Sequence, residues 1–367
     1  MMRKICITVI LCQAFLMNAL AQGNILTIKG AVIENPQEGD TVKLCTYKVI
    51  NGENKLLTLA SGITRNGKFS MSYECQPDVT IAFVAHGNDF VSVFTEPGQL
   101  TVSPTAPRVS GTPQNDTWRI YHERTTSIKK LIEEETPKYD AENHNAYIAG
   151  IFKTQAKYGP QLVKEQLDVA RRFPGKAIGA QALIDYAVQM GSNPQQALDS
   201  ITALGFIDYP DNSLQQQIEK LRGSLDAQPG KKFIDFTIPD GNADGTLAKL
   251  SDYVGKGKVV LVDFWGSWCM WCVRETPNLK AVYEKYKDQD FTVLGLACKD
   301  KRENTEKACE YHGTHWPQIF NCGDIPMKLY GLSGLPQIML FDRDGTLLAR
   351  DLRGEAIMKA VDKAMKK

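Results

Sequence analysis

The sequence predicts a multidomain chain that begins with an all-β sandwich, continues as a helical middle region and ends in an α/β domain. The chain has 367 residues, which is enough for two or three domains. Short alternating strands separated by turn residues fill residues 24–103. Apolar residues then recur at helical spacing over residues 118–225, and strands alternate with helices from residue 228 onward.

The first residues predict an export signal over residues 1–21. Arg3 and Lys4 form a short basic segment, residues 5–20 are apolar, and Ala19-Leu20-Ala21 offers a cleavage site with small residues at both ends. An uncleaved membrane anchor is the alternative, but the apolar run is short for a bilayer span. We therefore expect cleavage after Ala21 and an exported protein located in the periplasm.

Composition bounds the partners and the redox compartment. The formal net charge is +1, so the charge balance does not indicate nucleic acid as a partner. Two of the nine cysteines lie in the predicted signal, and its removal leaves seven: Cys45, Cys75, Cys269, Cys272, Cys298, Cys309 and Cys322. An exported protein can form disulfides, but an odd number of cysteines leaves at least one thiol unpaired within a monomer.

The all-β domain is expected over residues 22–110. Its strands are predicted at residues 25–30, 41–44, 68–73, 80–85, 90–95 and 100–102. Asn66-Gly67 is a hairpin-turn dipeptide, and Glu96-Pro97-Gly98 is a turn signal before the last strand. Pairing of Cys45 with Cys75 across this domain stays open, because the sequence gives no distances.

The middle region, residues 111–227, is predicted to be helical and to follow a proline-rich linker at residues 103–113. A first helix contains Trp118, Tyr121 and Ile128 at helical spacing, and further helices are expected at residues 146–157, 161–172, 177–190, 194–204 and 213–225. The chain should break at Gly159-Pro160, because proline disrupts a helix interior. We interpret this region as a spacer that packs on its neighbours.

The C-terminal domain, residues 228–367, contains the candidate reactive residues. An apolar run over residues 259–265 predicts a buried strand, and Cys269-Met270-Trp271-Cys272 and a helix-compatible segment follow it at once. Cys269 is thereby placed at a helix N-terminus, where backbone N–H groups and the helix dipole favour a thiolate. A thiolate attacks disulfides, and a second thiol at Cys272 can resolve the mixed disulfide. One helical turn should bury Cys272 and leave Cys269 at the surface.

The other elements of this domain complete a βαβ-ββα order. Strands are predicted at residues 233–237, 291–297, 336–341 and 347–351, and helices at residues 304–312 and 354–366. The turn sequence Asp342-Arg343-Asp344-Gly345 predicts a hairpin between the last two strands.

The surroundings of the cysteine pair resemble the thioredoxin family. Asp263 lies six residues before Cys269, and Trp268 directly precedes that cysteine. Pro277 follows Cys272 by five residues, at the position where thioredoxins bend the active-site helix. The resemblance implies an α/β thioredoxin-like fold over residues 228–367.

Two further segments refine the resemblance. Glu275 is similar to an acid of the exported TlpA/ResA-like branch, and Gly334-Leu335-Pro336 resembles the cis-proline loop. A cis peptide before Pro336 would leave the backbone of Leu335 free to bind an extended substrate chain. The N-terminal strands, with residues 66–70 and 96–102, resemble the β domain of unassigned function, DUF4369, that precedes thioredoxin modules in exported Bacteroidota proteins.

The resemblance implies a protein thiol–disulfide oxidoreductase with Cys269 as nucleophile and Cys272 as resolving thiol. Asp263 and Glu275 are candidate proton shuttles, because desolvation raises the pKa of a buried carboxyl toward neutrality. Pro336 completes the predicted catalytic set. The implied partners are cysteine-containing exported proteins, including oxidised cytochrome c precursors, and a membrane-bound thiol electron donor. No cofactor or metal is implied, since the two cysteines carry the electrons.

Trp268, Trp271 and Leu335 are the predicted substrate contacts, and Met270-Trp271 departs from the family pattern. Thioredoxins and their TlpA/ResA-like relatives keep a proline between the cysteines. Trp271 instead keeps an N–H that can stabilise the Cys269 thiolate, and it enlarges the apolar surface beside the sulfur. The direction of electron flow is therefore not predicted.

Three other functions compete with this interpretation. A peroxiredoxin-like thiol peroxidase would need a lone thiolate in a Thr-x-x-Cys loop, and that spacing is absent at Cys269. A binding or adaptor protein would use the first two regions for recognition and the redox site for regulation. A metal chaperone would use the cysteine pair, and Cys309, His312, His315 and Cys322 form a second, weaker metal pattern.

Overall fold

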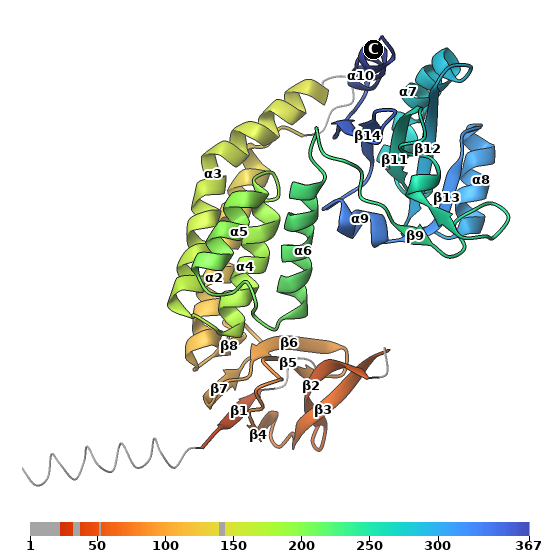
Figure 1. Ribbon diagram of the computed structural model, residues 1–367. Coiled ribbons are helices and arrows are strands. Elements are labelled where there is room, and N and C mark those ends of the chain that lie inside the picture. Colours follow the sequence, from red (N-terminus) through yellow and green to blue (C-terminus); the bar gives the residue numbers. More distant parts are fainter. Residues whose placement is uncertain (1–22, 32–36, 51–52, 139–143, 367) are drawn as a thin grey trace, which may run out of the picture. The chain divides into compact units, whose positions relative to one another are not determined.

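The computed structural model of this chain describes residues 23–31, 37–50, 53–138 and 144–366 (Figure 1). The predicted export signal at residues 1–21 lies outside the described residues. Two compact units are present. The first comprises the described residues up to Tyr186 together with Leu204–Phe206, and the second comprises Ala187–Ala203 and the residues from Ile207 onward. No helix within these described ranges is both long and apolar enough to cross a bilayer.

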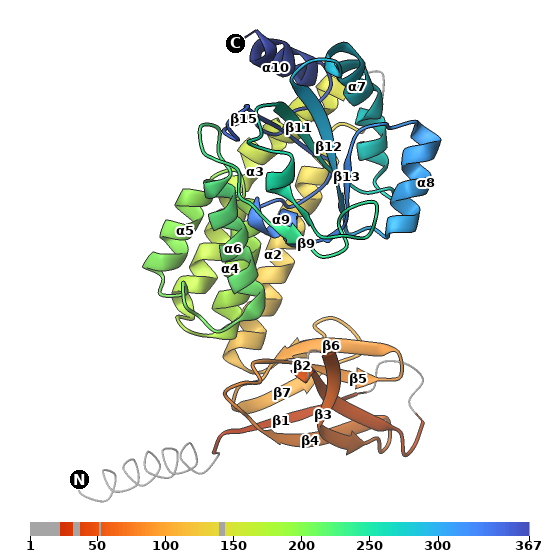
Figure 2. The same ribbon diagram turned by 45° about the vertical axis from the view of Figure 1, so that its right-hand side comes forward.

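The first unit begins with a β-sandwich of two four-stranded sheets, in the orders β4-β1-β7-β8 and β3-β2-β5-β6 (Figure 2). Alternate side chains of both sheets meet in one apolar core that includes Leu26, Val42, Phe69, Val84 and Leu100, as the alternating pattern predicts. The strands are β1 Ile25–Ala31, β2 Thr41–Ile50, β3 Glu53–Ile63, β4 Lys68–Glu74, β5 Ile81–His86, β6 Asp89–Phe94, β7 Gly98–Val102 and β8 Val109–Ser110.

Strand β3 is an element that the sequence did not predict. It forms a long antiparallel pair with β2, from Thr41 opposite Ile63 to Ile50 opposite Glu53. Most of its side chains are partly or fully exposed, so it lacks the alternation of buried and exposed residues that marks the other strands.

Residues 103–113, which the sequence predicts to be a linker, instead turn back toward the sheet. The last part of this segment forms β8, which pairs with β7. Helix α2 (Pro113–Glu135) then begins with proline at its first turn, where no N–H is needed. The buried amide of Asn115 bonds both the N–H and the C=O of Phe94, each at 2.9 Å, and so fixes the start of α2 on the sandwich.

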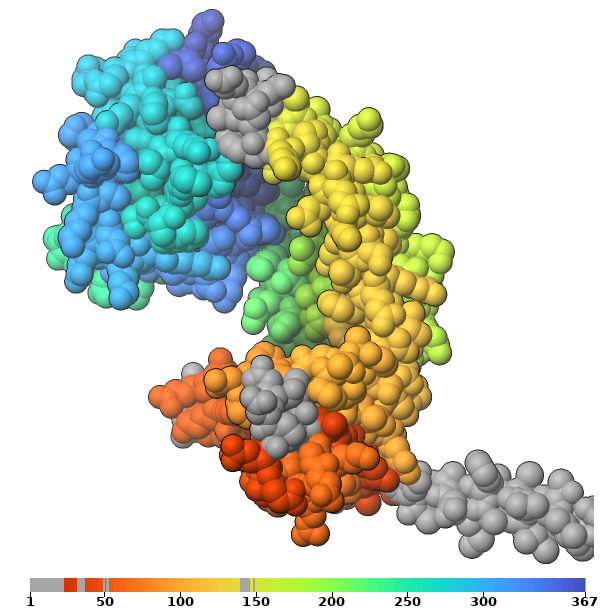
Figure 3. Space-filling view, turned by 180° about the vertical axis from the view of Figure 1, so that it is seen from behind, coloured from red at the N-terminus to blue at the C-terminus, as the bar shows by residue number. Residues whose placement is uncertain are grey.

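Three helices complete the first unit: α2, α3 (His144–Arg172) and most of α4 (Ala177–Gln189). Figure 3 shows α2 at the surface, following on from the sandwich strands. The predicted break at Gly159-Pro160 is wrong, because α3 continues through Pro160. Tyr158 and Leu162 on either side are buried, so tertiary packing outweighs the lost helical hydrogen bond.

The second unit contains α5 (Pro194–Ala203), α6 (Asn212–Asp226) and the C-terminal α/β domain. The predicted helical region at residues 111–227 thus contributes to both units. Close packing joins α6 to α9 (Ile325–Leu329) and to the turn that follows α9 within the second unit. A Cβ on Gly331, whose φ is +64°, would lie 2.3 Å from backbone atoms of Lys220 and Ser224. The Nη1 of Arg350 donates to the carbonyl of Ala227 at 2.6 Å just after α6.

The α/β domain is built on a five-stranded sheet in the order β13-β12-β11-β14-β15. Strands β11, β12 and β13 run parallel, while β14 and β15 pair antiparallel. The elements are β9 Thr237–Ile238, β10 Ala248–Lys249, the 3₁₀ turn Leu250–Asp252, β11 Val259–Trp265, α7 Met270–Tyr286, β12 Phe291–Cys298, α8 Arg302–His312, β13 Gln318–Gly323, α9 Ile325–Leu329, β14 Gln337–Phe341, β15 Leu347–Ala349 and α10 Glu355–Met365.

Every residue of β11 is buried, because both faces of the sheet are covered. Alternate residues of β11 pack with α7 and α10 on one face, and the others pack with residues near α9 and the opening segment on the other face. The fold class, an all-β sandwich followed by helices and an α/β domain, is confirmed. The sequence missed β13 and α9, and β9 begins only at the end of the predicted strand 233–237.

Candidate redox site

The cysteine pair lies where β11 passes into α7. Cys269 is the N-cap residue of α7 and forms a disulfide with Cys272. Cys272 is 2% exposed as expected, but Cys269 is also buried, with 6% of its surface exposed. The expectation that Cys269 lies at the surface is therefore wrong for this disulfide form. Trp265, Leu335 and residues of α8 pack against the pair and cover it.

A backbone donor supports the sulfur of Cys269. The N–H of Cys272 points to Cys269 Sγ at an N···S distance of 3.2 Å. The N–H of Trp271 was the predicted donor, and the structure shows a donor one residue further along, at Cys272. A donor at this position stabilises a thiolate that develops on Cys269 after reduction.

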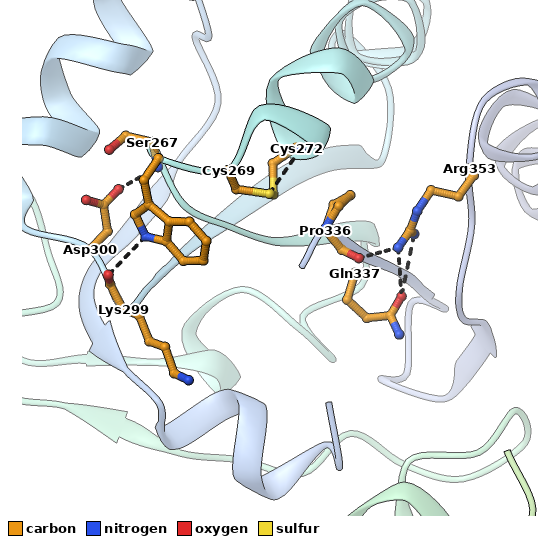
Figure 4. The surroundings of a disulfide bond; sticks show 9 residues. Ser267, Cys269, Cys272, Lys299, Asp300, Pro336, Gln337 and Arg353 are labelled. Atoms are coloured by element: carbon orange, nitrogen blue, oxygen red, sulfur yellow. Dashed lines mark hydrogen bonds between the residues drawn. A yellow bond between two sulfur atoms is a disulfide. The ribbon is translucent and has the colours of Figure 1, made fainter. Parts of the chain in front are cut away.

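The loop before Cys269 is held by residues that follow β12. The N–H of Ser267 donates to Asp300 Oδ2 at 2.6 Å, and Trp268 Nε1 donates to the carbonyl of Lys299 at 3.0 Å (Figure 4). A side chain at Gly266 would lie 2.8 Å from Trp268 Nε1, so glycine is required for this close approach. Sequence reasoning missed Asp300, although its place just after β12, beside the end of parallel β11, could have indicated it.

Large apolar side chains surround the buried disulfide on the outside. Trp268, Met270 and Trp271 have exposed fractions of 59%, 61% and 44%. The guanidinium of Arg274 lies 4.6 Å from the centre of the Trp271 ring, which is a cation–π distance. Exposed aromatic rings next to a reactive pair provide a contact surface for another chain. The substrate-binding role of Trp268 and Trp271 stays a prediction.

The predicted cis peptide is present between Leu335 and Pro336, directly before β14. Leu335 packs against the cluster of Trp265 and the two cysteines. Arg353 donates a hydrogen bond from Nη2 to the carbonyl oxygen of Pro336. Figure 4 shows Pro336 and Arg353 on the side of the disulfide opposite Ser267 and Asp300. Sequence reasoning did not select Arg353.

Asp263 is buried in the middle of β11, with 5% of its surface exposed. Its Oδ1 atom is buried without a hydrogen-bond partner among the described residues. Burial raises the pKa of Asp263 to about 7, the charge of Arg353 lowers it, and the charge of Glu275 raises it further. A carboxyl with this pKa can take up and release a proton near neutral pH.

Glu275 lies on α7, one helical turn after Cys272, and is partly buried. Its Oε2 atom accepts hydrogen bonds from Asn278 Nδ2 at 2.9 Å and from the N–H of Gly354 at 3.0 Å. The two predicted proton shuttles are therefore brought close enough for their charges to interact. Their catalytic roles remain predictions.

The remaining described cysteines are free thiols. Cys298 and Cys322 are buried on neighbouring strands, and burial raises the pKa of both. Cys309 packs beside the redox pair. Cys45 and Cys75 are buried and unpaired. Within the described ranges, no group of three or more histidine, cysteine or acidic side chains is arranged to hold a metal ion.

Comparison with known proteins agrees with this geometry. Residues 229–350 match the AhpC/TSA family, and residues 26–118 match the domain of unknown function DUF4369. The thiol-disulfide oxidoreductase ResA of Bacillus thuringiensis subsp. konkukian (strain 97-27) is 28% identical over 138 residues, which cover 38% of this chain and 77% of that protein. ResA of Geobacillus thermodenitrificans (strain NG80-2) is 34% identical over 111 residues, covering 30% of this chain and 62% of that protein.

Among solved structures, the thioredoxin domain of a thiol-disulfide oxidoreductase from Bacteroides vulgatus is 34% identical, covering 37% of this chain and 96% of that one, with a TM-score of 0.33. The family match over residues 229–350 and the order of the five strands identify the C-terminal domain as thioredoxin-like, with a disulfide between Cys269 and Cys272. More particularly, this part of the chain is homologous to the ResA thiol-disulfide oxidoreductases, and the first domain matches DUF4369.

Proposed function

We propose that this protein exchanges the Cys269–Cys272 pair with cysteines of other exported proteins. The observation that carries the proposal is a disulfide at the N-terminus of α7, placed between exposed tryptophans and the cis-proline loop. Each part serves disulfide exchange: a stabilised thiolate, a resolving thiol, a buried proton acceptor and a contact surface for a substrate chain.

In the reduced protein, the Cys269 thiolate attacks one sulfur of a substrate disulfide. A mixed disulfide forms, and the first substrate sulfur leaves as a thiolate that takes a proton from solvent. Asp263 then accepts the proton of the Cys272 thiol, and the resulting thiolate attacks Cys269 Sγ. The second substrate thiolate leaves, so two electrons pass to the substrate and the Cys269–Cys272 disulfide re-forms.

A complete cycle needs a reductant for the disulfide. We include a membrane-bound thiol donor as the partner that supplies two electrons. The substrates would bind as extended segments along the backbone of Leu335 and against Trp268 and Trp271. Reduction of oxidised cytochrome c precursors is the finer form of the proposal, and it rests on the resemblance to TlpA/ResA-like proteins.

The proposed location is the periplasm, following cleavage of residues 1–21. The basic start, the apolar run and the small residues around Ala21 support it. N-terminal sequencing of the protein recovered from the cell envelope should begin at Gln22. Recovery of the full-length chain in the cytosol would contradict the proposal.

The test of function is turnover of a disulfide-bonded peptide by the mature chain with dithiothreitol as electron donor. Cys269→Ser should abolish turnover, whereas reduced Cys272→Ser, mixed with the oxidised peptide after removal of dithiothreitol, should accumulate the mixed disulfide, seen as a mass increase equal to one peptide. Cys309→Ser is a matched control, because it removes a neighbouring thiol outside the proposed cycle. Turnover that survives Cys269→Ser, or faster consumption of hydrogen peroxide than of disulfide, would refute the proposal.

The reduction potential of the pair then decides the direction of electron flow. A value near that of thioredoxin, about −270 mV, would indicate a reductase that depends on a dedicated donor. A value near −120 mV would indicate an oxidant that donates disulfides to its partners.

A further inference from the structure

Arg353 and Gly354 form the turn that precedes α10. Through their hydrogen bonds and charge they interact with three separate parts of the candidate site. Arg353 Nη2 donates to the carbonyl oxygen of Pro336, next to the cis peptide. The N–H of Gly354 donates to Glu275 Oε2 at 3.0 Å. The positive charge of Arg353 also lowers the pKa of Asp263. Pro336 directly precedes β14, whereas Glu275 and Asp263 belong to α7 and β11, which lie far before Arg353 in the sequence.

The guanidinium of Arg353 is held in a defined direction. Its Nη1 donates to the carbonyl of Leu352 at 2.6 Å, and both Nη atoms lie 3.5 Å from Gln337 Oε1. The side chain is exposed overall, yet its planar end turns inward to the carbonyl of Pro336 (Figure 4). A planar fork that makes several hydrogen bonds is a property of arginine that lysine does not share.

The groups that face the buried carboxyl of Asp263 differ in charge. Glu275 on α7 is an acid, Cys298 on β12 is a buried thiol, and Arg353 is the cation. Burial and the charge of Glu275 raise the pKa of Asp263, and Arg353 acts in the opposite direction. Loss of the cation would therefore shift Asp263 toward its protonated form at a given pH.

We propose that Arg353 is a positioning residue of the redox cycle. Its hydrogen bonds hold the cis-proline loop against the disulfide, and its charge keeps Asp263 ionised enough to accept the proton of Cys272. The inference rests on the proposed disulfide exchange and adds a residue that acts through Pro336 and Asp263 rather than on the sulfur atoms.

Two substitutions separate the two roles. Arg353→Gln removes the charge, so the acid limb of the pH–rate profile should move upward by about one pH unit, which is a tenfold loss of rate below the midpoint. Arg353→Lys keeps the positive charge but loses the planar guanidinium that makes several hydrogen bonds. The midpoint of the pH–rate profile should therefore stay the same, while KM for a disulfide-bonded peptide rises several-fold. In an Asp263→Asn background, Arg353→Gln should cause no further shift of the profile.

Arg343→Gln is the matched control, since Arg343 lies in the hairpin turn and pairs only loosely with Asp342, at 3.8 Å. It should leave rate, KM and pH profile unchanged. A purely structural role for Arg353 predicts an equal loss of rate at every pH in both variants, and that result would overturn the inference. So would an Arg353→Gln shift that persists in the Asp263→Asn background.

Direct titration of the Asp263 carboxyl by carbon NMR does not depend on turnover. The midpoint of this titration should rise in the full-length Arg353→Gln protein and stay in Arg353→Lys. If the unsubstituted protein shows no disulfide exchange, the proposed function fails. The titration still decides whether Arg353 acts on Asp263, and an unchanged midpoint in Arg353→Gln refutes it. If Arg353→Gln fails to fold, the KM of Arg353→Lys tests the proposal instead. An unchanged KM in that variant would refute the role of the guanidinium hydrogen bonds.

Discussion

Replacement of Asp263 by asparagine should change how the stability of the protein depends on pH. The pKa of this carboxyl rises from 3.8 to about 7 in the folded protein, mainly because it is buried. A folded-state pKa above the unfolded value means that the folded state binds the proton more tightly. The contribution to stability is therefore fully present below pH 3.8 and is lost as the pH rises toward 7.

The magnitude follows from the shift. A rise of roughly 3 pKa units, at about 1.4 kcal/mol for each unit, makes ionised Asp263 cost the folded state about 4 kcal/mol. An asparagine has no such titration. The difference in unfolding free energy between Asp263→Asn and the unsubstituted protein should therefore grow in favour of the variant by about 4 kcal/mol from pH 3.8 to pH 8.

Urea unfolding followed by tryptophan fluorescence is the suitable assay. Four of the five tryptophans, at positions 265, 268, 271 and 316, lie in the second unit, so the signal reports mainly on the unit that contains Asp263. Because the same amide is present at every pH, any constant cost of its new N–H groups cancels from the slope. A stability difference that stays flat within about 0.5 kcal/mol from pH 4 to pH 8 would refute the reasoning.

Three further substitutions test other parts of the structure. Trp271→Pro removes one N–H at the start of α7 but leaves the N–H of Cys272 that donates to Cys269 Sγ, so the reduction potential should shift by less than about 30 mV; equilibration with glutathione measures this. Tyr330→Phe should lower the urea unfolding free energy of the second unit by about 1–3 kcal/mol, since its buried hydroxyl bonds both an N–H and a C=O of the opening segment at 2.9 Å. Gly331→Ala should destabilise the same unit by more than about 1 kcal/mol, because its positive φ and the backbone of α6 leave no room for a Cβ; circular dichroism during heating would show the lower midpoint.

The sequence predicted those parts of the site that are close together along the chain. Strand β11 and the Cys269–Cys272 pair at the start of α7 follow from an apolar run and the residues directly after it. Asp300 and Arg353 lie far from this motif along the chain, and no local pattern of residues marks either of them. Each reaches the site only because a strand end or a helix start from another part of the chain meets β11 in the folded sheet.

Local preference also failed where tertiary packing is stronger. Pro160 lies inside α3, although proline in isolation ends a helix, and the buried neighbours Tyr158 and Leu162 account for its tolerance. Strand β3 is the opposite case. Its side chains give no alternating pattern, and its place in the sheet is set by the pairing with β2 alone.

The position of Asp263 follows from a conflict between stability and proton transfer. An exposed aspartate with a pKa of 3.8 would be a weak acceptor for a thiol proton at neutral pH, because proton transfer is most effective when the pKa lies near the working pH. Burial in β11 raises the pKa of Asp263 to about 7, near the working pH. The same burial costs about 4 kcal/mol of folding free energy when the carboxyl is ionised. The charge of Arg353 opposes the increase in pKa that burial causes. The carboxyl therefore stays available as a base while it is enclosed by the sheet. Arg353 also holds Pro336 and thus links the proton acceptor to the loop that would receive the substrate.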